Sequence, residues 1–353
     1  MSATLRHQVG KLLIAGVEGL ELTATERAWL KLIRPSGVIL FRRNIEEAGQ
    51  TVQLLREAAE IIGAPGFRCI DLEGGPVDRF RDLLAPMPSP AAVFATAKLS
   101  LFKQHGRLIA QEARLLGFNT VFAPVLDLAL PESSAVMRTR VVSAEPEKVI
   151  KYASAFLEGL STEGILGCGK HFPGLGGGHL DSHQAMPVIQ RNWETMWAED
   201  IAPFRALAAK LPMIMVSHAS YPKASRDRRP ASVSAFWISD VLRNKIGYRG
   251  LVISDDMEMG GILTQRRMEE AAVEAVAAGT DLLEICKDPA LVLRSYEALL
   301  SEAETSPSFR RRVEESSRRS AQFLQSGGPA KLPKTPLIST IERLRRKIAS
   351  FGI

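Results

Sequence analysis

Short apolar runs rich in β-branched residues recur along the chain every 25 to 45 residues or so. Between them lie stretches with the periodicity of amphipathic helices, such as Ile45–Ile62 and Ser100–Leu116. Alternating strands and helices indicate a parallel sheet, and eight such units favour an α/β fold of the (β/α)₈ TIM-barrel type. An open doubly wound sheet is the alternative, although no G-x-G-x-x-G follows the first run. The expected strands are Lys11–Val17, Gly37–Phe41, Phe67–Glu73, Asn119–Asp127, Gly164–His171, Pro212–His218, Leu251–Asp256 and Thr280–Cys286.

The composition changes little until the Gly-Gly-Pro segment at residues 327–329, which has the character of a linker. We therefore expect one catalytic barrel over residues 1–325, followed by a linker and a basic helical extension over residues 326–353. With 353 residues, 46% of them apolar, the chain can bury a large core.

Positive charge gathers near the end of the sequence, where residues 309–353 hold eleven Lys and Arg against three Glu. Such a cluster could attract nucleic acid or anionic lipid. Apolar residues recur among the cations with helical spacing, however, as in an amphipathic helix with a solvated face. We expect neither a nucleic-acid nor a membrane partner. The apolar positions in question are Val313, Leu324, Leu344 and Ile348.

The first apolar run, Leu12–Val17, is interrupted by Glu18 before it reaches the length of a signal-peptide core. The cysteines Cys69, Cys168 and Cys286 each lie in an apolar run and lack metal-type spacing, so we expect buried, reduced thiols. A cytoplasmic protein is the expectation. The oligomeric state stays open, with a monomer favoured.

Charged and polar residues follow several of the predicted strands directly. In a (β/α)₈ barrel the carboxyl ends of the strands meet in one bowl, which is where active sites lie. Any one of these residues could instead cap the next helix, but together they predict a single polar site. They are Asp71, Glu73, Asp127, Lys170, His171, Ser217, His218, Asp255 and Asp256.

Convergent carboxylates, a lysine, an arginine such as Arg79 and several histidines suit a substrate with many hydroxyl groups, and a sugar is the natural candidate. Retaining glycoside hydrolysis needs a carboxylate nucleophile and a nearby proton donor. Asp255 can supply the nucleophile. Spacing alone leaves the donor open between Glu73, Asp256 and His183, although Asp181 lies two residues from His183 and could orient its imidazole.

Eight segments together resemble glycoside hydrolase family 3, in particular its single-domain bacterial β-N-acetylglucosaminidases (β-N-acetylhexosaminidases). They follow the family order over about residues 8–325. The segments are G-V-I-L-F-R-R-N-I (37–45), D-L-E-G-G-P-V-D-R-F (71–80), F-A-P-V-L-D-L (122–128), K-H-F-P-G (170–174), D-S-H (181–183), P-A-S-V-S (230–234), V-I-S-D-D-M (252–257) and A-G-T-D-L-L (278–283).

The resemblance implies that Asp255 is the nucleophile, His183 the acid/base and Asp181 its partner. It further implies that terminal β-linked N-acetylglucosamine is released, from muropeptides derived from peptidoglycan, without a cofactor or a metal ion. The residues implied to bind the sugar are Asp71, Arg79, Arg140, Lys170 and His171. Arg138 is the neighbouring alternative to Arg140.

Other functions stay open. A glycoside phosphorylase could use the same site, since a neutral imidazole does not repel phosphate, and a β-glycosidase could act on another sugar. A metal-dependent hydrolase could use His171, His179, His183 and Asp181, and a glycan-binding module would need no turnover. The chain also departs from the family pattern at Leu72, Pro76 and Leu175, the last of which replaces a histidine in a Gly-rich loop whose glycines 176–178 we expect to act as a hinge.

Overall fold

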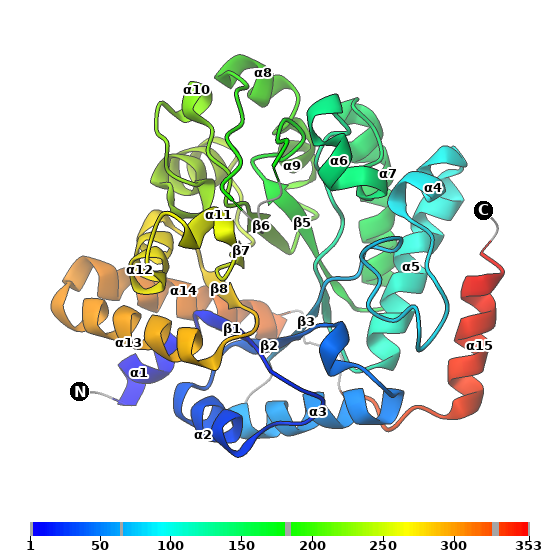
Figure 1. Ribbon diagram of the computed structural model, residues 1–353, viewed down its shortest axis with the longest axis horizontal. Helices are drawn as coiled ribbons and strands as arrows, with labels where there is room; N and C mark the ends of the chain where they lie inside the picture. Colours follow the sequence, from blue (N-terminus) through cyan, green and yellow to red (C-terminus); the bar gives the residue numbers. More distant parts are fainter. Residues whose placement is uncertain (1–2, 64–65, 181–184, 327–331, 352–353) are drawn as a thin grey trace.

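Eight parallel strands close into a barrel in the computed structural model, which describes residues 3–63, 66–180, 185–326 and 332–351 (Figure 1). The strand order is sequential, and β1 pairs with both β2 and β8. The predicted barrel is confirmed, and the open-sheet alternative is wrong. The strands are β1 Leu13–Gly16, β2 Gly37–Leu40, β3 Phe67–Ile70, β4 Thr120–Val121, β5 Leu166–Phe172, β6 Met213–Val216, β7 Leu251–Asp256 and β8 Leu282–Ile285.

Helices surround the barrel, and the longer ones lie outside the strands that they connect (Figure 1). They are α1 Ala3–Gly10, α2 Ala24–Ile33, α3 Ala48–Ile62, α4 Pro90–Ala95, α5 Leu99–Leu115, α6 Ser134–Met137, α7 Pro146–Thr162, α8 Trp193–Ala198, α9 Ala202–Leu207, α10 Pro222–Ser225, α11 Gly260–Leu263, α12 Met268–Ala278, α13 Pro289–Thr305, α14 Pro307–Ser326 and α15 Ile338–Ala349, with a π-helix at Phe236–Lys245.

Local sequence signals set several helix ends. At the start of α2, Thr23 accepts a hydrogen bond from the Glu26 amide, while the Glu26 carboxylate accepts one from the Thr23 amide. At the start of α13, Asp288 caps the helix and Pro289 occupies its first position, where no amide partner is needed. None of the described helices combines the length and the apolar character that a membrane crossing requires.

The fourth strand is much shorter than predicted. The apolar run suggested Asn119–Asp127, but regular pairing covers only Thr120–Val121. Pro124 has no amide hydrogen to donate, and pairing resumes only as a single bridge between Val125 and Lys170. Asp127 therefore lies in the loop beyond β4, at the carboxyl end of the barrel.

The barrel interior is filled by alternate residues of the strands, together with Cys286, which directly follows β8. All three cysteines belong to this cluster and are free and buried, as predicted. Helix α14 contributes Leu324 to the same cluster. It covers the amino-terminal end of the barrel, where Ser320 lies 3.0 Å from the Ser36 hydroxyl that precedes β2. The barrel is therefore closed at this end and can open only at the other.

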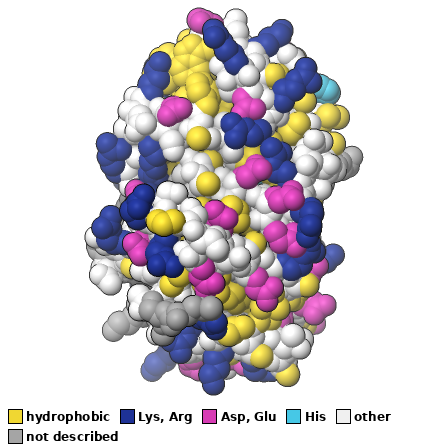
Figure 2. Space-filling model, turned by 90° about the vertical axis from the view of Figure 1, so that its left-hand side faces the viewer, with side chains coloured by type: hydrophobic (Ala, Val, Ile, Leu, Met, Phe, Trp, Pro, Cys, Tyr) yellow, Lys and Arg dark blue, Asp and Glu magenta, His cyan; other side chains and the backbone are white. Residues whose placement is uncertain are grey.

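The last two helices have the amphipathic character expected from their sequence. Val313, Leu324, Leu344 and Ile348 are all buried. Helix α15 lies along the outside of α5, far from the N-terminus (Figure 1), and Arg345 donates hydrogen bonds to the Leu83 and Leu84 carbonyls. On the face that holds α12, α13 and α14, basic and acidic side chains are interspersed (Figure 2).

Candidate active site

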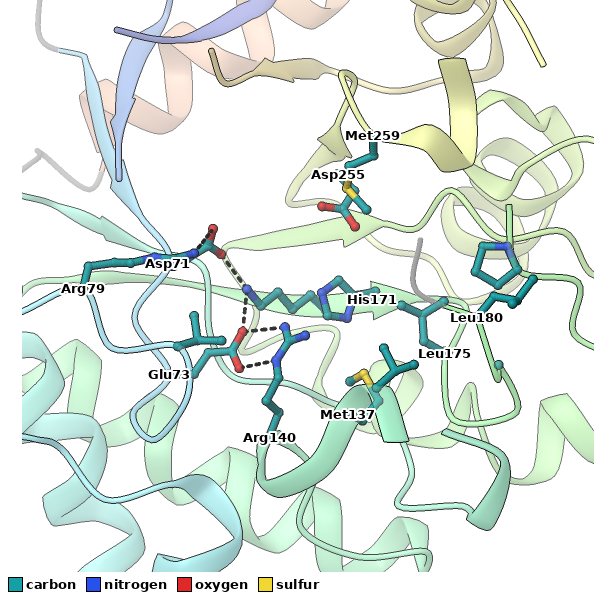
Figure 3. A pocket seen from close by; sticks show the side chains of 15 residues that line it. Asp71, Glu73, Arg79, Met137, Arg140, His171, Leu175, Leu180, Asp255 and Met259 are labelled. Carbon is teal, nitrogen blue, oxygen red and sulfur yellow. Dashed lines mark hydrogen bonds and ion pairs between the residues drawn. The ribbon is translucent and has the colours of Figure 1, made fainter. Parts of the chain in front are cut away.

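A cavity of about 120 Å³ lies at the carboxyl ends of the strands and is lined by the loops that follow β3, β4, β5 and β7 (Figure 3). It contains six of the eight site residues expected from the sequence. They are Asp71, Arg79, Arg140, Lys170, His171 and Asp255. Asp181 and His183, the expected acid/base pair, lie outside the described residues.

Glu73 is the centre of an ionic cluster on one side of the cavity (Figure 3). Its carboxylate accepts two hydrogen bonds of 2.8 Å from the guanidinium of Arg140, one to each oxygen. Lys170 Nζ lies 2.8 Å from Glu73 Oε1 and 2.7 Å from Asp71 Oδ1, and Arg79 approaches Asp71 at 3.7 Å. Lys170 thus joins two carboxylates, while Arg79 is held only loosely.

These ion pairs set the charge states of the cluster. Burial alone would raise the pKa of Glu73, but the charges of Arg140 and Lys170 outweigh it and hold the pKa far below its usual range. Burial likewise opposes ionisation of Asp71, whose pKa is nevertheless lowered by Lys170 and Arg79. Burial would lower the pKa of Lys170, which Asp71 and Glu73 raise instead. The cluster is therefore fully ionised at neutral pH.

His171 is oriented by Asp127. Its Nδ1 lies 2.7 Å from Asp127 Oδ2, and its backbone amide donates to both oxygens of the same carboxylate. The start of the Gly-rich loop uses the same acceptor, because the Leu175 amide donates to Asp127 Oδ1 at 2.7 Å. One buried carboxylate thus positions both the His171 ring and the start of the loop.

Asp255 is the penultimate residue of β7 and projects into the cavity, across from the ionic cluster (Figure 3). Asp256 does not line the cavity. It accepts a hydrogen bond from the Glu258 amide, and burial raises its pKa to about 7. Because successive residues of a strand point to opposite sides, only the first aspartate of the pair can face a substrate in this cavity.

A sequence model of the glycosyl hydrolase family 3 N-terminal domain matches residues 4–322. The chain belongs to glycosyl hydrolase family 3. The beta-hexosaminidase of Idiomarina loihiensis is 36% identical over 296 residues, which cover 83% of this chain and 88% of that protein. The beta-hexosaminidase of Tolumonas auensis is 38% identical over 283 residues, covering 79% and 83%.

A solved structure of a family 3 β-N-acetylglucosaminidase from Paenibacillus sp. str. FPU-7 superposes with a TM-score of 0.90. The sequences are 29% identical, and the match covers 99% of this chain and 69% of that one. The family resemblance and the barrel are therefore confirmed, and the protein is a glycoside hydrolase.

The structure decides between several candidates that spacing left open. Arg140 lines the cavity of this family 3 enzyme, whereas Arg138 is exposed and donates to the Ala135 carbonyl. His218 is a buried histidine, with Nδ1 2.7 Å from the Ser232 hydroxyl and Nε2 3.0 Å from the Asp256 carbonyl oxygen. It supports the end of β7 from behind and does not line the cavity.

Of the residues named for a metal-dependent hydrolase, His179 is exposed and His171 Nδ1 faces Asp127. Across the described residues, no group of three or more His, Cys, Asp and Glu is arranged to hold a metal ion. Asp181 and His183 lie outside that set.

The departures from the family pattern occupy different environments. Leu72 is fully buried, Pro76 is exposed and Leu175 lines the cavity. The glycines after Leu175 are closely packed. A Cβ on Gly176 would lie 2.6 Å from the Leu128 carbonyl oxygen, and one on Gly177 would lie 2.9 Å from Arg191 Cδ. Close packing against backbone thus requires glycine at position 176, a role that the expected hinge does not include, whereas at position 177 the Arg191 side chain would have to shift.

Sequence reasoning missed two features of the site. It placed Glu73 in the polar site and weighed it as a proton donor, but spacing cannot show that Arg140 and Lys170 meet at its carboxylate. It also missed the apolar residues Met137, Leu180 and Met259 that line the cavity. The sequence did carry a weak signal for Met137: it lies three residues before Arg140, and in a helix residues at this spacing lie on the same face.

Proposed function

We propose that the protein is a retaining β-N-acetylglucosaminidase that releases terminal β-linked N-acetylglucosamine, with muropeptides derived from peptidoglycan as natural substrates in the cytoplasm. The single observation that carries the proposal is the position of Asp255: among the described residues that line the cavity, it is the one carboxylate outside the ionic cluster, whose hydrogen-bond donors face it. The names of the Idiomarina, Tolumonas and Paenibacillus relatives support the choice of sugar.

The reaction has two displacements. Asp255 attacks the anomeric carbon while protonated His183 donates its proton to the glycosidic oxygen, so the bond to the aglycone breaks and a glycosyl ester forms. Neutral His183 then takes a proton from water, whose oxygen attacks the same carbon. The bond between that carbon and the Asp255 oxygen breaks, which frees the sugar and restores the Asp255 carboxylate. Asp181 orients the imidazole. Asp71, Arg79, Arg140, Lys170 and His171 hold the sugar, directly or through their ion pairs.

The charge of Glu73 supports the assignment of the proton donor to His183. A general acid must carry a proton at working pH. Arg140 and Lys170 hold the pKa of Glu73 far below its usual range, so this carboxylate has no proton to give. An imidazole, by contrast, titrates near pH 6.5 and can serve in both steps.

An aryl β-N-acetylglucosaminide and the matching aryl β-glucoside test the sugar specificity. The proposal expects a strong preference for the first and a loss of at least about a thousandfold in kcat for Asp255→Asn. Asp240→Asn, an exposed aspartate in the π-helix, is the matched control and should retain wild-type rates. Equal rates on both sugars, or an active Asp255→Asn enzyme, would overturn the proposal.

The role of His183 has its own test. His183→Ala should reduce the rate on alkyl glycosides, which need protonation of the leaving group, far more than the rate on activated aryl glycosides. A slowly turned-over fluorinated N-acetylglucosaminyl fluoride should label Asp255, as detected by mass spectrometry of peptides. Equal losses on both substrates, or a label on another residue, would contradict the mechanism.

A further inference from the structure

The cavity has two halves of opposite character. The ionic cluster of Asp71, Glu73, Arg79, Arg140 and Lys170 occupies one side. Most of the apolar lining lies elsewhere, and we call four of its side chains the apolar wall; Figure 3 shows three of them to the right of and below Asp255 and the fourth, Met259, next to Asp255. The wall consists of Met137 from α6, Leu175 and Leu180 from the loop after β5, and Met259 from the loop after β7.

Core packing accounts for only part of the wall. Met137 is 2% exposed, Met259 4% and Leu175 9%, so each of them shows an edge to the cavity. Leu180 is 43% exposed beside them. A lone exposed leucine is common, but one that extends an apolar surface inside a binding cavity favours a ligand with an apolar part.

Leu175 brings an apolar side chain next to the polar part of the cavity. Its backbone amide donates to Asp127, the carboxylate that also holds the His171 ring, so the side chain has a defined place beside that ring. The apolar wall therefore begins directly beside a residue that is proposed to bind the sugar.

The arrangement also indicates which part of a substrate meets the wall. Sugar hydroxyls need the donors and acceptors of the ionic cluster, and the anomeric carbon must face Asp255. Because nucleophile and leaving group lie on opposite faces of that carbon, the glycosidic bond points away from Asp255. Figure 3 shows Met137 and Leu175 across the cavity from Asp255. The aglycone, and not the hydroxyl-bearing part of the sugar, is the group that reaches Leu175, Leu180 and Met137.

Building on the proposed function, we propose that the apolar wall is an aglycone subsite that selects glycosides with an apolar group next to the scissile bond. Such a group is an alkyl or aryl aglycone, in preference to one that carries oxygen atoms. Binding would remove its methylenes and the exposed part of Leu180 from water together. Each methylene buried in this way should raise kcat/KM by about fourfold.

The test uses methyl, butyl and hexyl β-N-acetylglucosaminides, whose leaving groups have nearly equal basicity. A 2-(2-hydroxyethoxy)ethyl glycoside matches hexyl in chain length but carries two oxygens. We expect kcat/KM to rise at least about tenfold from methyl to hexyl, and the oxygen-containing chain to lose most of that gain. Leu180→Ser should reduce the ratio of hexyl to methyl by about fivefold, while Leu32→Ser, a more exposed leucine on α2, should leave it unchanged.

The outcomes separate the subsite from the proposed function. A wild-type enzyme that hydrolyses all four glycosides at equal kcat/KM is a glycosidase without an apolar subsite, which overturns this inference alone. An equal loss on methyl and hexyl glycosides in Leu180→Ser would also overturn it, because the wall would then contact the sugar. If the enzyme hydrolysed neither these four glycosides nor aryl N-acetylglucosaminides, the proposed function itself would be wrong.

Discussion

Two buried ionic clusters lie at opposite ends of the barrel and use the same groups for different purposes. At the carboxyl end, Glu73 binds Arg140 and Lys170. At the amino-terminal end, Asp281 binds Arg243, Arg312 and Arg319. Each cluster is built around a carboxylate that is at most 1% exposed and that two or three cations surround. Charge and burial at the central carboxylate therefore do not distinguish them.

The difference lies in what covers each cluster. Helix α14 supplies Arg312, Arg319 and the Ser316 hydroxyl to Asp281, and the Val252 amide completes the set of donors. The oxygens of Asp281 thus face only protein. At the other end, none of the described helices crosses the barrel, and Asp71 and Arg79 retain 18% and 28% exposure. A buried ion pair becomes part of a binding site when some of its donors still face an open space.

Lys170→Met should produce the largest effect, because it removes the cation shared by Asp71 and Glu73. Both carboxylates lose a partner in a buried place, so we expect the free energy of unfolding to fall by about 3 kcal/mol. We also expect kcat/KM to fall by about 10²–10³-fold, since the sugar loses a preorganised neighbour. Urea unfolding and initial rates measure the two effects. Lys210→Met, which removes a surface lysine, is the control. If Lys170→Met were as stable and as active as the wild type, the assignment of Lys170 would be wrong.

Asp281→Asn should show that the cluster at the amino-terminal end of the barrel contributes to stability but not to catalysis. It leaves three partly buried guanidinium groups, which are 13–26% exposed, without their shared anion, so the free energy of unfolding should fall by about 3 kcal/mol. Because α14 closes this end far from the cavity, kcat/KM at a temperature where the variant is folded should change less than about twofold. Thermal unfolding and steady-state rates provide the comparison. If the rate falls as far as in Lys170→Met, the two clusters are not functionally distinct.

The pH dependence of stability should come from the carboxyl end. The pKa of Glu73 is depressed in the folded state, so its contribution is fully present above the unfolded value of about 4.3 and is lost as the pH falls below it. Between about pH 5 and pH 3, the wild type should lose about 1–2 kcal/mol more than Glu73→Gln. Urea unfolding across this range measures the slopes. If the free energy of unfolding fell equally with pH in the wild type and in Glu73→Gln, protonation of Glu73 would not be coupled to unfolding.

How far the sequence predicts these features depends on the range of the interaction. Apolar runs with polar ends predicted all eight strands, because period and burial are local properties. The same pattern placed Asp71, Lys170 and Asp255 at one end of the barrel, since parallel strands share their carboxyl ends. The strand bounds were overestimated where Pro124 interrupts pairing, which an apolar run does not reveal.

Local sequence patterns could not predict ion-pair partners that lie far apart in the sequence. Helical periodicity correctly predicted that Val313 and Leu324 are buried, but it could not predict that Arg312 and Arg319 reach Asp281, more than 30 residues away. Likewise, the acidic character of Glu73 was plain from the sequence, while its pairing with Arg140 across 67 residues was not. A side chain's chemistry is local information, whereas its charge state depends on neighbours that only the fold brings together.

Ser316→Ala should have the smallest effect and test how completely Asp281 is satisfied. The Ser316 hydroxyl donates to Asp281 Oδ1 at 3.2 Å, but this oxygen also accepts from Arg312 at 2.8 Å and from Arg319 at 2.5 Å. Because two charged donors remain, we expect a loss of only about 0.5–1 kcal/mol in the free energy of unfolding, with unchanged rates. Ser317→Ala, on the next residue of α14, is the control. A loss as large as that of Asp281→Asn would mean that the hydroxyl, and not the guanidinium groups, keeps this end of the barrel closed.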